Sequence, residues 1–244
     1  MEGTKEQRAR PRRTRENINP LDAWQPKTHL GTLVKSSRIT LSDIFTYTLP
    51  IKEPEIVDFF LKDTLKEEVL CVNSVQKQTK AGQRTRIKAL VCVGDGKCFV
   101  GIGAKTSRDA ATAIRGAVQR AKCALMYVKL GYWSSSVGKV HTVPVTARGK
   151  AGSVRIKLIP APKGTGLVAG GVPRTILRMA GVKDIYSKSV GQTCNTENFA
   201  KATVDALVRA SNFYSPDLWN SKVEGVNPLL RGDDGAAGDR RRRG

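Results

Sequence analysis

Residues 83–129 decide the fold and read QRTRIKALVCVGDGKCFVGIGAKTSRDAATAIRGAVQRAKCALMYVK. Charged and apolar residues alternate over 84–89 and an apolar run follows to Val93, which is the period-2 pattern of a strand that becomes buried. The glycines and the aspartate at 94–97 favour a tight turn. Residues 98–102 then predict a second strand that returns beside the first.

A long helix is expected after this second strand. Thr106 and Asp109 have the spacing of a capping box, and apolar residues recur at helical spacing from Ala110 to Val128. Gly103 is expected to form the corner between strand and helix. The unit is therefore strand, hairpin, strand, glycine corner and helix.

Basic residues dominate the same region. From Lys77 to Lys122 there are eleven Lys and Arg, and the only acidic residues are Asp95 and Asp109. Four cations recur every seven residues and are expected on one flank of the helix, namely Arg108, Arg115, Lys122 and Lys129. A solvated helix face usually mixes both signs, whereas a surface of one sign attracts polyanions. The pattern indicates a nucleic-acid-binding surface.

The basic excess lies in the middle of the chain and not mainly at its ends. The 244 residues carry a formal net charge of +21, and residues 77–190 hold 22 Lys and Arg but only three acidic residues. A chain of this length can form one large domain or two small ones, each with its own core. The charge is therefore expected on folded surface.

The five cysteines and two histidines predict neither a disulfide nor a metal site. The cysteines are odd in number and lack a C-x-x-C pair, and a zinc site needs four suitably spaced ligands. Three of them have apolar neighbours and are expected as buried thiols. No apolar run approaches the roughly 20 residues of a membrane span, and the N-terminus lacks the apolar core of a secretory signal. We expect an intracellular protein without a cofactor.

The N-terminal residues 1–40 predict a basic extension. Its segment RPRRTR at 10–15 suits nuclear import or an arm that lies along phosphates. Residues 24–34 have mixed composition, and we expect them to lie extended on a partner or on the protein's own core.

The next residues predict two short helices and a further strand. The helices are expected at 41–48 and 55–61, separated by prolines. The acidic stretch 52–68 would repel RNA and is expected on the back of the domain, with a basic protein as a second possible neighbour. A strand at 68–75 and a polar loop at 76–83 are then expected before the first strand of residues 83–129.

The resulting order of helix, three strands and helix over 41–130 resembles a double-stranded-RNA-binding domain. The likeness extends to the basic, alanine-rich final helix. Such modules read the shape of A-form RNA, its 2′-hydroxyls and its phosphates, and not its base sequence.

Residues 131–138 are bounded by glycines and predict a linker to a second domain at 139–214. Its expected elements are a strand at 140–146, a basic hairpin at 148–152, a strand at 153–159, a glycine-rich loop at 160–171, a helix from Pro173 to Gly181, a strand at 183–190 and a final helix capped by Asn195. Residues 215–244 are expected to be an irregular C-terminal extension that ends in four arginines.

The glycine-rich loop also invites an enzymatic interpretation. Residues 164–169 fit G-x-G-x-x-A and Asp184 follows at the distance seen in dinucleotide-binding folds, but Pro160 and Pro162 separate the glycines from the strand. A phosphoryl-transfer enzyme needs carboxylates, and none lies between Lys139 and Lys183. We therefore expect the loop amides to hold phosphates that never react.

His141 is expected to be structural and not catalytic, because no acid lies nearby in the sequence to orient it. No catalytic or metal-binding residue is predicted. The residues expected to bind RNA are Lys77, Lys80, Arg84, Arg86, Lys88, Lys97, Lys105, Arg108, Arg115, Arg148, Lys150, Arg155, Lys157, Lys163, Gly164, Thr165, Gly166 and Arg174.

Several longer motifs resemble one family of ribosomal proteins. They are VQKQTKAGQRTRIKALVCVGDG, VGIGAKTSRDAATAIRGAV, GKVHTVPV, IPAPKGTGLVAGGVPRTILRMAGVKD and NTENFAKATVDAL. This set closely resembles the universal small-subunit ribosomal proteins of the S-five family. LPIKEPEIVDFFL and SPDLW resemble its eukaryotic form, which is called S-two, so that the likeness runs over roughly residues 24–219.

The resemblance implies an α+β fold, in which an α-β-β-β-α module of the double-stranded-RNA-binding kind precedes a C-terminal split βαβ domain with a left-handed crossover. It also implies a structural role on the rRNA of the 40S subunit near the mRNA entry channel, with an influence on mRNA passage, subunit assembly and translational fidelity. The implied neighbours are proteins of the bacterial S-two, S-four and S-eight families, the first being a different protein from the eukaryotic S-two. The implied location is the cytoplasm after a nucleolar assembly stage, with no membrane and no small-molecule substrate.

Two other functions remain open on the sequence. One is a free double-stranded-RNA-binding regulator, which would not sediment with 40S particles. The other is a small-molecule kinase, since kinases share the fold class of the second domain, and the missing carboxylates count against it.

Overall fold

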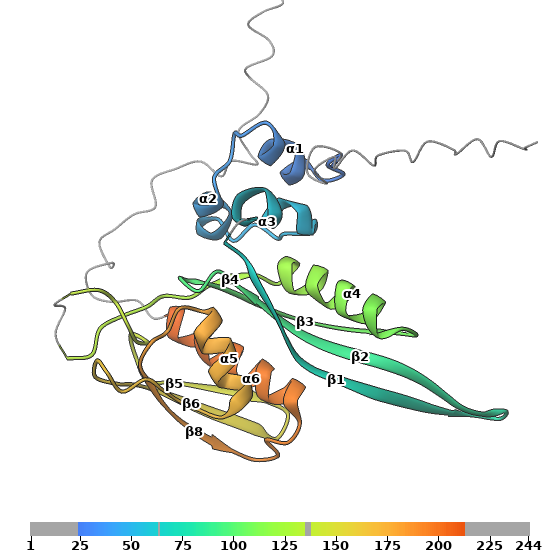
Figure 1. The fold of residues 1–244 in the computed structure, drawn as a ribbon. Coiled ribbons are helices and arrows are strands. Elements are labelled where there is room, and N and C mark those ends of the chain that lie inside the picture. The colour runs from blue at the N-terminus through green and yellow to red at the C-terminus, as the bar shows by residue number, and fades with distance from the viewer. Residues whose placement is uncertain (1–23, 63, 135–137, 213–244) are drawn as a thin grey trace, which may run out of the picture.

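The strands and the helix expected from residues 83–129 are present in the computed structural model, which describes residues 24–62, 64–134 and 138–212. They belong to an antiparallel sheet in the order β1-β2-β3-β4, and α4 lies along one face of it (Figure 1). The elements are β1 (Lys66–Thr79), β2 (Gly82–Gly94), β3 (Phe99–Ser107), α4 (Ala110–Cys123) and β4 (Met126–Tyr127).

The first hairpin is much longer than expected. β1 and β2 stay in register out to the pair Thr79 and Gly82, so that only Lys80 and Ala81 form the turn. The expected polar loop at 76–83 is therefore wrong. Polar side chains on both faces of these strands do not prevent the ladder, because its hydrogen bonds come from the backbone.

Two glycines in β3 let α4 approach the sheet closely. A Cβ on Gly103 would lie 2.2 Å from the carbonyl oxygen of Ala117, and one on Gly101 would lie 2.3 Å from that of Ala121. The expected glycine corner is thus wrong, since Gly103 lies inside the strand and serves packing.

The start of α4 also differs from expectation. Asp109 is the N-cap residue, but no side-chain hydrogen bond caps the helix, so the capping box with Thr106 is not formed. The helix is tied to the sheet further along, where Arg120 Nη1 donates to the carbonyl oxygen of Ala104 at 3.0 Å.

Three helices precede the first sheet and form a layer beside α4 (Figure 1). They are α1 (His29–Lys35), α2 (Leu41–Thr46) and α3 (Pro54–Leu61). Trp24 and residues of all three helices share one buried cluster with Leu125. Residues 29–35 are therefore helical and not extended, and they pack on the protein's own core.

Part of the acidic stretch is satisfied inside the protein. Glu53 accepts hydrogen bonds from Trp24 Nε1 at 3.0 Å and from two backbone amides. Lys122 Nζ lies 2.8 Å from Asp58 and 3.2 Å from Glu67. The expected basic flank of α4 is therefore wrong. Lys122 pairs with acids of α3 and β1, and Arg108 and Lys129 lie outside the helix, which ends at Cys123.

The C-terminal part forms a second, mixed sheet in the order β5-β6-β8-β7. Its elements are β5 (Ala147–Ala151), β6 (Val154–Pro160), β7 (Leu167–Val168), α5 (Gly171–Met179), β8 (Ile185–Val190) and α6 (Thr196–Ser211). β7 pairs parallel to β8, so that β7, α5 and β8 form a βαβ unit. The strand expected at 140–146 is not formed, and only the isolated bridge between Gly131 and Thr142 is present there.

Two predicted helix caps are confirmed, at the end of α5 and at the start of α6, whereas α5 begins at Gly171 and not at the expected Pro173. Gly181 has a φ of +81° after α5, its N–H donates to the Arg178 carbonyl, and the N–H of Val182 donates to the Leu177 carbonyl, which is a Schellman cap. Asn195 caps α6 by accepting from the amide of Asn198 at 3.3 Å.

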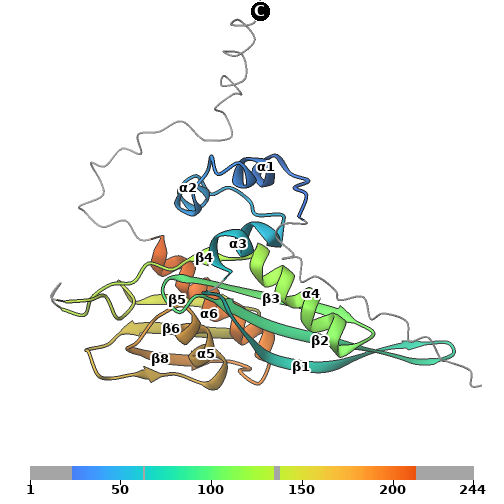
Figure 2. The same cartoon turned by 45° about the horizontal axis from the view of Figure 1, so that its top comes forward.

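Helices α5 and α6 lie between the two sheets (Figure 1, Figure 2). One buried cluster includes residues from β2 and β3 of the first sheet and from β6, β8, α5 and α6. The turn after β2 also reaches α5, because the amide of Gly96 donates to the Met179 carbonyl at 2.9 Å. The two halves thus share a core, and among the described residues no helix lies on the opposite face of the second sheet.

Within the described ranges, none of the helices combines the length and the apolar character needed to cross a membrane. Over the same residues, no group of three or more His, Cys, Asp or Glu side chains is placed to hold a metal ion. Burial raises the pKa of the Cys92 thiol to about 12 and the charge of Glu68 adds to the rise, so this thiol stays protonated near neutral pH.

We expect Gly103→Ala to lower the free energy of unfolding by about 1 to 3 kcal/mol, because the added methyl overlaps the backbone of α4. The matched control is Gly116→Ala on α4 itself, where a methyl meets only the flexible side chain of Lys105 at 2.9 Å. Helix propensity favours that change by about 1 kcal/mol. Urea unfolding of both variants measures the difference, and equal destabilisation would contradict the packing role of Gly103.

Candidate RNA interface

The distal half of the first hairpin projects beyond the rest of the protein (Figure 1). We call residues 73–88 the arm. From Asn73 to Arg86 nearly every residue is exposed, and residues 69–94 contain no Asp or Glu. The arm is therefore a two-stranded ribbon whose charges are all positive.

The register places the cations of the arm on one of its two faces. Lys77 lies opposite Arg84, and Arg86 is two residues further along β2. The other face carries neutral polar residues, among them Gln83 and Thr85. Lys80 lies in the turn. The sequence predicted these four cations, and the structure brings them together.

Three further predicted cations lie near the base of the arm. Ser107 at the end of β3 pairs with Ile87, so the exposed Arg108 follows directly beside the arm. Lys105 and Arg115 are exposed on the side of the sheet that α4 covers. Lys97 is separate, because it lies in the turn at the other end of β2.

The uncovered face of the second sheet holds a second basic cluster. Arg148 pairs with Lys157, which pairs with Lys188 of β8, while Lys150 pairs with Arg155. Directly paired residues share a face, and these five cations line a groove of about 390 Å³. We call it the basic groove.

Lys188 was missed as a site residue. The alternation of side chains along residues 185–190 could have identified it, because it places Lys188 on the same face of the strand as Tyr186 and Val190. These two residues are 43% and 57% exposed. Arg209 also lines the groove, but its guanidinium pairs with Asp205 at 3.1 Å.

The glycine-rich loop is held by an acid that lies 20 residues away from its first glycine. The amides of Gly164 and Gly166 donate to one carboxylate oxygen of Asp184, at 3.1 and 2.9 Å. The other oxygen lies 2.9 Å from Nδ1 of His141, and both side chains are buried. These two amides are therefore occupied, and in this conformation they do not form the expected phosphate cradle.

The remaining predicted residues of this region stay exposed or half-buried. Lys163 and Arg174 are exposed, and Thr165 Oγ1 donates to the carbonyl of Pro162 at 2.8 Å. That the side chains of this loop contact RNA thus stays a prediction. His141 is buried and does have an acidic partner, Asp184, which the sequence places 43 residues away; its structural role stays a prediction.

Two family models match the chain. Ribosomal protein S5, N-terminal domain, matches residues 65–129, and ribosomal protein S5, C-terminal domain, matches residues 149–222. Together the two matches cover more than half of the chain. The chain belongs to the ribosomal protein S5 family. It is accordingly a structural constituent of the ribosome. As such, the protein binds rRNA and neighbouring ribosomal proteins.

The two S5 matches correspond to the two sheets. The first begins at the start of β1 and ends just after β4, and the second begins in β5. The layer of α1, α2 and α3 lies outside both matches. The arm and the basic groove therefore belong to the S5 domains themselves and not to the added helices.

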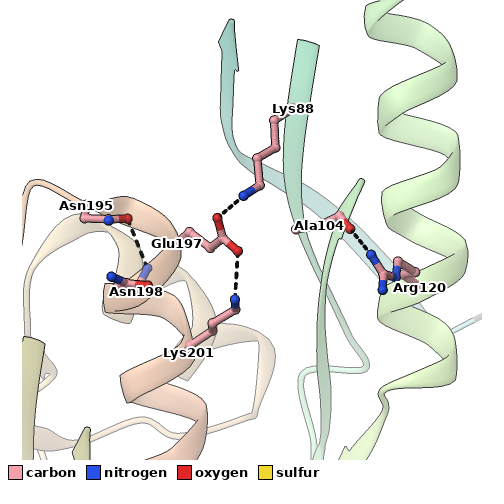
Figure 3. Close-up of polar contacts among 7 residues, drawn as sticks. All are labelled: Lys88, Ala104, Arg120, Asn195, Glu197, Asn198 and Lys201. Atoms are coloured by element: carbon pink, nitrogen blue, oxygen red, sulfur yellow. Dashed lines mark hydrogen bonds and ion pairs between the residues drawn. The ribbon is translucent and has the colours of Figure 1, made fainter. Parts of the chain in front are cut away.

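A salt bridge joins the two S5 domains at the base of the arm (Figure 3). Lys88 Nζ binds Glu197 in the first turn of α6, and Lys201 Nζ binds the other oxygen of the same carboxylate at 2.8 Å. Hydrogen bonds from Lys201 and from Lys88 lower the pKa of Glu197. Lys88, which we expected at RNA, is thus engaged inside the protein and positions the arm relative to α6.

We expect Glu197→Gln to lower the free energy of unfolding at pH 7 by about 1 kcal/mol, since it removes a partly buried ion pair and a charge at a helix N-terminus. The folded-state pKa is below the ordinary value. The carboxylate therefore stabilises the fold above its unfolded pKa of about 4.3, and this contribution is lost as the pH falls through the folded pKa.

Unfolding by urea at several pH values measures this effect, and the difference in unfolding free energy between wild type and variant should shrink as the pH falls through the folded pKa. Lys201→Gln is the control, because it leaves the bond between Lys88 and Glu197 in place and should cost no more than about 0.5 kcal/mol. A difference that stays constant as the pH falls would show that charge is not the cause.

Proposed function

We propose that this S5-family protein is a constituent of the small (40S) ribosomal subunit. There it binds rRNA near the mRNA entry channel and supports subunit assembly, mRNA passage and translational fidelity. The subunit, the channel and the fidelity role come from the resemblance of the quoted motifs to the eukaryotic S-two protein. The observation that carries the RNA contact is the arm, a projecting ribbon with cations on one face and no acid.

The geometry of the arm suits the backbone of structured RNA. Strand residues on one face recur about every 6.6 Å, which is twice the rise per residue, and the strongly basic face offers Lys77, Arg84 and Arg86 to successive phosphates. Contacts of this kind hold the RNA without reading its sequence. The basic groove supplies a second phosphate-binding surface on the other S5 domain.

A free double-stranded-RNA-binding regulator is the second candidate function. The arm alone would serve it equally well. Membership of the S5 family favours the ribosomal function, and sedimentation in a sucrose gradient separates the two, because a free regulator stays at the top of the gradient while a constituent sediments with 40S particles.

A matched pair of double variants tests the arm. Arg84→Gln with Arg86→Gln removes two charges from the basic face, while Gln83→Glu with Thr85→Glu changes the net charge equally on the opposite face. The slope of the logarithm of RNA affinity against the logarithm of salt concentration counts the phosphates contacted. We expect the first pair to reduce the magnitude of this salt slope by about 2, roughly one for each lost phosphate contact. The measurement is the dissociation constant for a structured rRNA fragment between 50 and 200 mM salt.

The control pair should change the slope by less than about half as much, because its face does not touch RNA in this proposal. Equal effects of both pairs would mean that only net charge matters. Incorporation into 40S particles in cells, compared for the same two pairs, shows whether the contact serves the subunit.

The basic groove is tested in the same way with Lys157→Gln and Lys188→Gln. The matched control is Lys62→Gln with Lys66→Gln, two exposed cations in the acidic stretch. The groove pair should weaken RNA binding for all sequences about equally and reduce the slope by about 2, whereas the control pair should leave binding nearly unchanged. An unchanged slope in the groove pair would exclude the groove from the interface.

A further inference from the structure

An apolar groove lies where the N-terminal helices, β4 and the end of α6 meet. Its volume is about 780 Å³, and its wall includes Phe45, Leu49, Phe99, Tyr127 and Val208. None of the described residues that line it is charged. A groove without cations does not suit a phosphate backbone, so RNA is not its natural occupant.

Three aromatic rings form a row along this groove. The ring centroids of Phe45 and Phe99 are 5.0 Å apart, and those of Phe99 and Tyr127 are 5.7 Å apart. Tyr127 ends the row and is 49% exposed. Such a row offers surface on which a further aromatic side chain can stack.

The sequence that follows the end of α6 is rich in aromatic residues. Ser211 and Asn212, at the end of α6, line the groove, and the sequence continues FYSPDLW over 213–219. Four of these seven residues are large and apolar. Seven residues reach up to about 23 Å when extended, so the segment can extend well beyond the rim.

The family comparison adds an independent argument. The match to the S5 C-terminal domain runs to residue 222, beyond the end of α6 at Ser211. Residues 213–222 therefore belong to the domain that the family shares and not to the arginine-rich end of the chain. A segment of this composition needs an apolar surface, and the groove begins where the segment begins.

We propose that residues 213–219 occupy this groove, with Leu218 and Trp219 against the row of Phe45, Phe99 and Tyr127. The segment then ties the end of α6 in the C-terminal domain to α2 and β4 of the N-terminal part. This is a contact within the chain and is independent of the RNA function proposed above.

A double-mutant cycle on the full chain tests the contact. Trp219→Ala should lower Tm by about 4 to 8 °C, as expected for the loss of a largely buried aromatic side chain in a protein of this size. Tyr127→Ala should also lower Tm, and the double variant should lower it by less than the sum, because the two side chains lose the same contact. Trp133→Ala, on a 48% exposed residue outside the groove, is the control and should shift Tm by less than about 2 °C.

A second measurement does not depend on the stability of the variants. The difference in fluorescence between wild type and Trp219→Phe reports Trp219 alone, and it should resist acrylamide quenching. Additive Tm shifts, or quenching as strong as that of an exposed tryptophan, would overturn the proposal.

The other possible occupants give distinct results. If a chain that ends at Asn212 keeps the Tm of the full chain and dimerises in sedimentation equilibrium, the groove belongs to a second copy. If it keeps that Tm and stays monomeric, the groove is left for another protein. Either result overturns the proposal.

Discussion

The placement of α5 and α6 between two sheets governs the rest of the structure. Both sheets send apolar side chains toward these helices, so that one cluster runs from β2 and β3 through the helices to β6 and β8. The first sheet has a second apolar face, where Ala89, Val91 and Val93 of β2 pack against alanines of α4. Two surfaces are left uncovered by the part of the chain that the structure describes, namely the far part of β1 and β2 and the outer face of the second sheet. Burial thus decides where the protein can present charge, since cations stay at positions that no layer covers.

Close backbone approach makes this layering possible. Gly101 and Gly103 admit α4 to β3, and Gly149 admits α6 to β5, where a Cβ would lie 2.0 Å from the carbonyl oxygen of Ala202. Alanines face these glycines, as Ala117 does at Gly103. Small residues on both sides bring helix and sheet together at a distance that larger side chains would prevent.

The sequence predicted the elements whose patterns are local and missed what depends on distant partners. Alternation and helical spacing found β2, α4 and α6, and the caps of α5 and α6 follow from Gly181 and Asn195. The full length of β1 and β2 was missed because a run of polar residues usually indicates a loop. Here the backbone hydrogen bonds between the two strands are enough to continue the hairpin. The cations of the candidate site were identifiable by type, but their grouping was not. Lys88 and Lys122 have acidic partners from other elements, and the amides of the glycine loop meet Asp184 only in the folded chain.

The arm has a consequence for the energetics of assembly. A ribbon of two strands without an apolar face is only marginally stable in water, and from Asn73 onward both faces of this one are open. Neighbouring like charges weaken it further, whereas phosphates that neutralise them remove that repulsion. In the proposed contact with rRNA, the phosphates cover the basic face of the arm, and part of the binding free energy is spent on ordering the ribbon.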